Sequence, residues 1–216
     1  MRRNSHEVAV QAIIFGTLGF RASLEVTVHP RSETLCSQLL PWLEQLNLGA
    51  PIEEFHRKIL ETPYRELPRE SHTEAYWRGE AASFLAWAIQ LLEKPNPIGW
   101  VDPGRLIEGL RIFQPNVSDL VSSAILRSEL EVDDYCALCL TMRHHFQVSV
   151  LDKEGQAVLK RIHQSRLAEL GLSEAFHRQQ EEIEREAAEL VSAVPSVRGL
   201  YVVRALTSEW LLGENE

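Results

Sequence analysis

The chain has few cysteines, no surplus of basic residues and no long uninterrupted hydrophobic run, and each absence excludes a class of protein. Three cysteines among 216 residues are too few, and odd in number, for a disulfide framework. They are typical of a protein in a reducing compartment. With 31 acidic against 22 basic residues the formal net charge is −9, which argues against a nucleic-acid-binding protein. An acidic surface instead suits the attraction of a basic partner.

The N-terminal segment is the one place where a targeting or membrane sequence has to be considered. Two arginines precede an apolar run, as in a signal peptide, but Glu7 and Gln11 interrupt the run and no small-residue cleavage site follows. The run is also shorter than the roughly 20 apolar residues that span a bilayer. We therefore expect a cytoplasmic protein without a membrane partner.

The sequence motifs of common catalytic and ligand-binding sites are missing as well. The chain contains no glycine-rich phosphate loop, nucleophile elbow, HExxH zinc motif or EF-hand loop. We expect no cofactor and no bound metal, and the balance of these absences favours a protein that is not an enzyme.

What the sequence does contain is helical periodicity over nearly its whole length. Apolar stripes, capping residues and prolines predict helices over 5–19, 32–47, 52–61, 71–93, 105–113, 117–126, 132–146, 157–170, 173–194 and 197–212. Asn4 or Ser5 is expected to cap the first helix, Gly19 to end it, and Pro41 to kink or split the second. Alternating patterns predict a short strand over 24–28 and a small hairpin near 146–155.

The segment 94–104, with three prolines and two glycines, predicts a loop. It could mark a domain boundary, but the sequences on both sides resemble core helices. We therefore expect one helical domain over residues 1–216. The predicted fold class is mainly α, a single-domain multi-helix bundle with room for one small β-hairpin.

The most informative segment is 71–93, which is apolar almost all the way round and therefore typical of a central, buried helix. It nevertheless carries Arg78 and Glu80 in its middle. Residues two apart do not face each other on a helix, so each needs a partner elsewhere. Glu74 lies one turn before Arg78, and Arg204 in the last predicted helix is a plausible partner for Glu80.

Two interpretations of these charges remain open. The simpler is a buried ion-pair clasp between this helix and the last one, which specifies packing more than it stabilises. The alternative is a small-ligand or catalytic pocket in which Trp77 and Trp87 surround a carboxylate with a shifted pKa. The tentative binding residues are therefore Trp77, Arg78, Glu80, Trp87 and Arg204.

The residues Trp77-Arg78-Gly79-Glu80-Ala81, followed by Leu85-Ala86-Trp87-Ala88, form a W-R-x-E-A…L-x-W-A pattern on one helix. In this pattern the chain resembles an uncharacterised, largely helical bacterial family of unknown function. Arg204-Ala205-Leu206 and the Trp210 that follows fit the family less closely, because the tryptophan comes later than in the family's R-A-L-N-W-L. Members continue to a further segment that this chain lacks, so chemistry carried there is not expected here. The resemblance implies a helical fold and no particular reaction.

Cys136 and Cys139 form a C-x-x-C motif, followed by His144-His145. Two cysteines and a histidine could ligate zinc, but no second pair completes four ligands. The cysteines lie one turn apart on the apolar stripe of a helix, where free cysteine is most often buried. We expect them in the core rather than in a metal or redox site.

The helix predicted over 173–194 has an acidic face opposite its apolar stripe. His163, His177 and Glu181 could share a metal or a proton, since the last two lie one turn apart. A solvated acidic surface is the simpler interpretation, and a docking face for a basic partner is the sharper one. The tentative partner-facing residues are Glu181, Glu182, Glu186 and Glu189.

The function expected from the sequence is a non-enzymatic, acidic protein-interaction module. Its most concrete form is an immunity-type protein that binds and blocks a toxin, because a negative face steers onto a basic nucleic-acid-degrading or nucleotide-handling site. No nucleic-acid partner is expected. The rival is a small-ligand binder or enzyme that uses the Arg78/Glu80 region.

Overall fold

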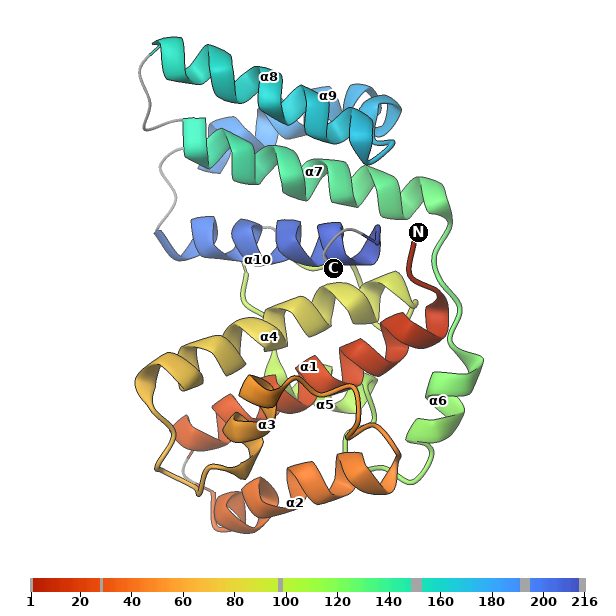
Figure 1. The fold of residues 1–216 in the computed structure, drawn as a ribbon, viewed down its shortest axis with the longest axis vertical. Helices are drawn as coiled ribbons and strands as arrows, with labels where there is room; N and C mark the ends of the chain where they lie inside the picture. Colours follow the sequence, from red (N-terminus) through yellow and green to blue (C-terminus); the bar gives the residue numbers. More distant parts are fainter. Residues whose placement is uncertain (1, 28, 97–98, 149–152, 191–194, 214–216) are drawn as a thin grey trace. The chain divides into compact units, whose positions relative to one another are not determined.

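The computed structural model describes residues 2–27, 29–96, 99–148, 153–190 and 195–213. Within these ranges the chain forms ten α-helices and no strand, which confirms the predicted mainly α, multi-helix fold class (Figure 1). The helices divide between two compact units. The N-terminal unit is Asn4–Leu126, and the C-terminal unit combines Met1–Arg3 with Arg127–Glu216. The units meet between Leu126 and Arg127, not in the proline-rich loop over 94–104. The single domain expected from the sequence stays a prediction.

The N-terminal unit is built around two long helices, α1 and α4, which pack more extensively against each other than any other pair (Figure 1). The unit's four shorter helices surround this pair, and each of them contacts α1. The bounds of the six helices are α1 Ser5–Val26, α2 Ser32–Gln45, α3 Glu54–Glu61, α4 Arg69–Ala88, α5 Pro103–Gly109 and α6 Val117–Ser123.

Helix α1 starts where the sequence predicts but does not end there. The Asn4 side chain accepts the Glu7 N–H at 3.0 Å and Glu7 accepts the Asn4 N–H at 2.8 Å, which makes a reciprocal capping box. The predictions that Gly19 ends the helix and that residues 24–28 begin a strand are wrong, because α1 continues to Val26. A Cβ on Gly19 would lie 2.5 Å from the Cα of Gly79 in α4, so this glycine permits close helix packing.

The length of α1 bears on the expectation that the N-terminal apolar run is too short to span a bilayer. It is the one helix among the described residues that is long and apolar enough to cross a membrane by length and composition. Of its most apolar 18-residue window, 72% is buried inside the structure, and a core helix passes the same test. The absence of a membrane partner stays a prediction.

Two expectations for α2 and α3 are also corrected. The prediction that Pro41 splits the second helix is wrong, because α2 runs unbroken from Ser32 to Gln45 with the proline exposed. The third helix starts later than the predicted residue 52, because α3 begins at Glu54 and Glu53 occupies the capping position with an extended ψ of 145°. Pro51 lies in the preceding turn, and Ile52 is buried in the core.

The C-terminal unit is organised around α7, which contacts each of the other three helices of that unit (Figure 1). The bounds are α7 Glu129–Val148, α8 Lys153–Glu169, α9 Ser173–Leu190 and α10 Pro195–Leu211. The N-terminal segment joins this unit: Arg2 pairs with Asp133 at 2.7 Å and the Arg3 N–H donates to Leu211 at 3.1 Å. The predicted hairpin is wrong over residues 146–148, where α7 is helical, and its continuation at 149–152 lies outside the described residues.

Candidate functional site

Glu80 is fully buried in α4, and its carboxylate binds the backbone of the proline-rich loop over 94–104. The Val101 N–H donates to Glu80 Oε1 at 2.7 Å. Next to this contact, the Trp100 ring lies 5.2 Å from both Tyr76 and Trp77. Burial, and then the charge of Glu80, raises the pKa of Tyr76. The carboxylate and the three rings together fasten this segment of the loop to α4.

Arg78 lies at the surface rather than in the core. Its side chain is 34% exposed, and its Nε donates to Glu74 Oε1 at 2.6 Å, which confirms the helical neighbour pair expected from the spacing. The guanidinium carbon also lies 4.7 Å from the centre of the Phe15 ring in α1. These contacts fix Arg78 between two helices without directing it at a cavity.

The sequence analysis missed His56, which extends this ion pair to α3. His56 is 1% exposed; its Nε2 lies 3.6 Å from Glu74 and its Nδ1 lies 3.5 Å from Glu53. The polar contact with His56, and further the charge and hydrogen bond of Arg78, hold the pKa of Glu74 below its usual value against the opposing effect of burial. The only sequence signal was that His56 precedes Ile59 by one turn on the apolar side of a short amphipathic helix.

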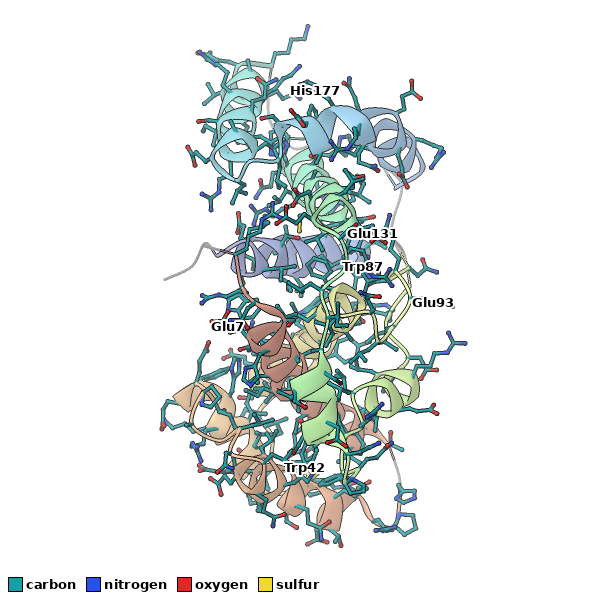
Figure 2. All side chains as sticks on the ribbon, turned by 90° about the vertical axis from the view of Figure 1, so that its right-hand side faces the viewer. Glu7, Trp42, Trp87, Glu93, Glu131 and His177 are labelled. Carbon is teal, nitrogen blue, oxygen red and sulfur yellow. The ribbon has the colours of Figure 1, made fainter. Side chains whose placement is uncertain are left out.

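The two tryptophans proposed to line one pocket have different neighbours. Trp87, labelled in Figure 2, is buried and stacks on Phe84 with centroids 5.7 Å apart. Trp77 packs instead against the loop residue Trp100. A small hollow nearby is lined by other residues, namely Gly19, Phe20, Ser23, Tyr76, Gly79, Val101, Pro103, Leu106 and Ile107.

Arg204 belongs to the C-terminal unit, where it is 1% exposed and lies 5.8 Å from the ring of Tyr201. Glu80 belongs to the N-terminal unit. Their pairing therefore stays a prediction.

A second buried cation, Arg21, was also missed by the sequence analysis. It is fully buried in α1, pairs with Glu25 one turn later and donates to the carbonyl oxygens of Thr62 at 2.9 Å and Pro63 at 3.2 Å. Glu25 in turn accepts the Arg65 N–H at 3.1 Å. These contacts connect α1 to the segment between α3 and α4 and give Arg21 a structural role.

The cysteines lie where the sequence predicts. Cys136 and Cys139 are fully buried on α7, and burial raises the pKa of the Cys136 thiol far above its usual value despite a hydrogen bond with Ser208. A thiol that stays protonated is a poor metal ligand and nucleophile. Among the described residues no three metal-ligating side chains gather.

The histidines form a different group from the one proposed. His163 stacks on His144 of α7, with ring centroids 4.3 Å apart, and contacts Thr141 Oγ1 at 3.2 Å. His177 is exposed on α9 and packs beside Phe176 (Figure 2). Glu181, one turn further along α9, is exposed as well.

The acidic face of α9 points outward wherever its side chains are described. Glu174 and Glu181 are exposed and Glu182 is half-buried, whereas Ala175 and Ile183 are buried. The side chains of Glu186 and Glu189 lie outside the described residues. The arrangement presents a negative surface on a helix that α7 anchors from the other side.

Comparison with known proteins adds no assignment: no family model matches the chain, and no curated protein or solved structure is significantly similar to it. Membership of the family with the W-R-x-E-A pattern stays a prediction.

Proposed function

We propose that the chain is a non-enzymatic protein-interaction module that binds a basic partner through the acidic face of α9. The observation that supports this most directly is the exposure of Glu174 and Glu181 on a helix whose Ala175 and Ile183 are buried. Helix α9 carries six glutamates and two arginines, so its negative charge per residue is higher than that of the chain as a whole. Such a face speeds association with a positively charged surface.

The most concrete form of the proposal is a cytoplasmic, immunity-type protein that covers the basic active site of a toxin. A toxin that handles nucleic acid or nucleotides presents cationic groups to bind phosphate, and a helix rich in glutamate can occupy the same groups. Within this proposal the partner-facing residues are Glu181, Glu182, Glu186 and Glu189, and Glu174 extends the surface toward the start of α9.

The rival function, a ligand-binding or catalytic pocket at Arg78 and Glu80, has less support. One oxygen of Glu80 already accepts the Val101 amide, and Arg78 is bound to Glu74. A carboxylate that holds the backbone of its own chain in place is less able to bind a substrate or transfer a proton. Within this proposal we therefore assign the W-R-x-E-A pattern around these residues a structural role.

The test compares two charge reversals of equal size. The first variant carries Glu174→Lys, Glu181→Lys and Glu182→Lys on α9. The matched control carries Glu61→Lys, Glu66→Lys and Glu93→Lys, three glutamates that are exposed on the N-terminal unit. Tagged wild-type protein is purified from its host, and stoichiometric partners are identified by mass spectrometry and then measured by calorimetry at two salt concentrations.

We expect one basic partner that binds wild type and the control variant alike, with binding weakened by salt and about 10- to 100-fold by the α9 reversal. If the partner is a toxin, co-expressed wild type should restore growth and the α9 variant should not. A partner-free protein, or a partner that binds the α9 variant as tightly as wild type, would contradict the proposal.

A further inference from the structure

Two histidines from different helices form a stacked pair inside the C-terminal unit. The rings of His144 in α7 and His163 in α8 are nearly parallel, with an interplanar angle of 7° and centroids 4.3 Å apart. His163 Nε2 lies 3.2 Å from the hydroxyl of Thr141, one turn before residue 144 on α7. Both rings are half-buried. Face-to-face contact at this distance is compatible with two neutral imidazoles and opposes a charge on both rings at once.

The groups around the pair are mostly cationic or apolar. From α7 come Arg143 and His145, from α8 Lys160, and from α9 the Phe176 ring, whose centroid lies 6.3 Å from that of His163, with the exposed His177 next to it in the chain. Arg143 also binds Glu209 of α10 at 2.8 Å, and the Nε of Arg166 lies 3.7 Å from the same carboxylate. This carboxylate is thus balanced by two guanidinium groups.

This environment favours the neutral rings. Burial, and then the charges of His144 and Arg143, lowers the pKa of His163 to about 4. Burial, and then His145 and Lys160, lowers the pKa of His144 as well. A histidine in an unfolded or undocked segment titrates near 6.5. Protonation is therefore easier when α8 has left α7 than when it is docked.

We propose that the stacked pair of His144 and His163 is an acid-sensitive latch that holds α8 against α7 and releases the helix when a ring gains a proton. Helix α8 is suited to leave without unfolding the rest of the unit. Most of its side chains are exposed, including Val158 at 43% and Ile162 at 61%, and Leu167 is its one fully buried residue among those described. Its attachment therefore depends strongly on the face that carries His163.

The pH range of the latch follows from the direction of the shifts. The docked pKa of His163 lies below the undocked value, so the docked state binds protons less readily. Docking is fully favoured above about pH 6.5 and loses stability as the pH falls toward the docked pKa of His163, about 4. Release is thus expected in acidic solution, between the undocked value near pH 6.5 and the docked pKa of His163.

Hydrogen exchange of the full-length protein tests the latch. Protection factors, which correct for the intrinsic pH dependence of exchange, are measured for amides of α8 at pH 7.5 and 4.5, with α4 as the internal reference. We expect protection in α8 to fall by about 50-fold relative to α4, as linkage predicts for a group that titrates near 4 when docked and near 6.5 when free. An α8 that keeps its protection at pH 4.5 would overturn the proposal.

Three substitutions separate the latch from general acid sensitivity. His163→Gln removes the ring whose docked pKa is about 4, so the pH-dependent loss of protection should shrink at least fivefold. His144→Gln removes the second titrating ring and should shrink the loss by a smaller amount. His177→Gln, on the exposed side of α9, is the matched control and should behave as wild type. If neither latch variant folds, the titration of the His163 ring protons in wild type is measured by NMR. A midpoint below 5.5 supports the latch, and a midpoint at 5.5 or above overturns it.

Discussion

Gly19 of α1 and Gly79 of α4 lie against each other at the point where the two longest helices of the N-terminal unit pack. A Cβ added to Gly19 would come within 2.5 Å of the Gly79 Cα, and one added to Gly79 would lie 3.1 Å from the Gly19 Cα. The obstructing atoms are backbone, so only movement of a whole helix could relieve the contact. The pair sets the separation of α1 and α4, and with it the positions of the residues on α4.

The first prediction concerns this contact. Gly19→Ala should destabilise the protein by about 2 kcal/mol, because overpacking against backbone outweighs the higher helix propensity of alanine. Gly79→Ala should destabilise the protein less, because its added Cβ would lie 3.1 Å from the facing Cα rather than 2.5 Å. Chemical denaturation measures both. Gly104→Ala, on the exposed surface of α5, is the control and should change stability little; equal effects at Gly19 and Gly104 would contradict the role of close packing.

A second prediction concerns the anchoring of the loop by Glu80. Glu80→Ala removes the acceptor of the Val101 N–H and should destabilise the protein by about 2–3 kcal/mol. Hydrogen exchange at Val101 should increase at the same time. Glu80→Gln keeps an oxygen that can accept this bond and should lose less. Glu93→Ala, at an exposed position, serves as the control. Unchanged exchange at Val101 in Glu80→Ala would show that the loop is held by the rings alone.

The third prediction is a pH dependence that arises from Glu74. The folded pKa of Glu74 is lowered from its ordinary value of 4.5, mainly by the polar contact with His56 and further by Arg78. The native state therefore binds this proton less readily than the unfolded state, so the stabilisation is complete above about pH 4.5 and is lost as the pH falls through the folded value. Urea denaturation between pH 6 and pH 3 should show a smaller acid-induced loss in Glu74→Gln than in wild type. If the stability of the two proteins falls in parallel as the pH is lowered, this role of Glu74 is contradicted.

A fourth prediction concerns the buried thiols. Cys36, Cys136 and Cys139 are all buried, and burial raises the pKa of Cys36 as well as that of Cys136. A thiol reagent at pH 8 should label the native protein very slowly and label three thiols once the protein is denatured. Added zinc should leave the melting temperature unchanged. Rapid labelling of the native protein, or a zinc-dependent rise in the melting temperature, would contradict a purely structural C-x-x-C pair.

Several parts of the candidate site could be predicted because they depend on neighbours along one helix. The Glu74–Arg78 pair follows from a spacing of four residues, and the burial of Cys136 and Cys139 follows from their place on an apolar stripe. The capping of α1 by Asn4 is equally local. In each case the interacting groups are brought together by the helix itself, so the sequence contains the needed information.

Other parts could not be predicted because distant segments create them. A glycine such as Gly19 is typical of a helix end, and only its close contact with Gly79 explains why a glycine stands inside this helix. From the sequence Arg21 resembles a surface residue, and only the folded chain supplies the carbonyl oxygens of Thr62 and Pro63 that accept its hydrogen bonds. His163 was assigned to His177 and Glu181, whereas its ring contacts His144 on another helix.

The sequence by itself determined the helical fold class, the location of most helices, the net negative charge and the outward acidic face of α9, since these follow from periodicity and composition. Tertiary structure alone decided the length of α1, the use of Glu80 to hold Val101, and the pairing of His144 with His163. The physical reason is that the free energy of a buried charge, a close backbone contact or a stacked ring depends on which segments surround it. Sequence spacing reports that information only within a helix.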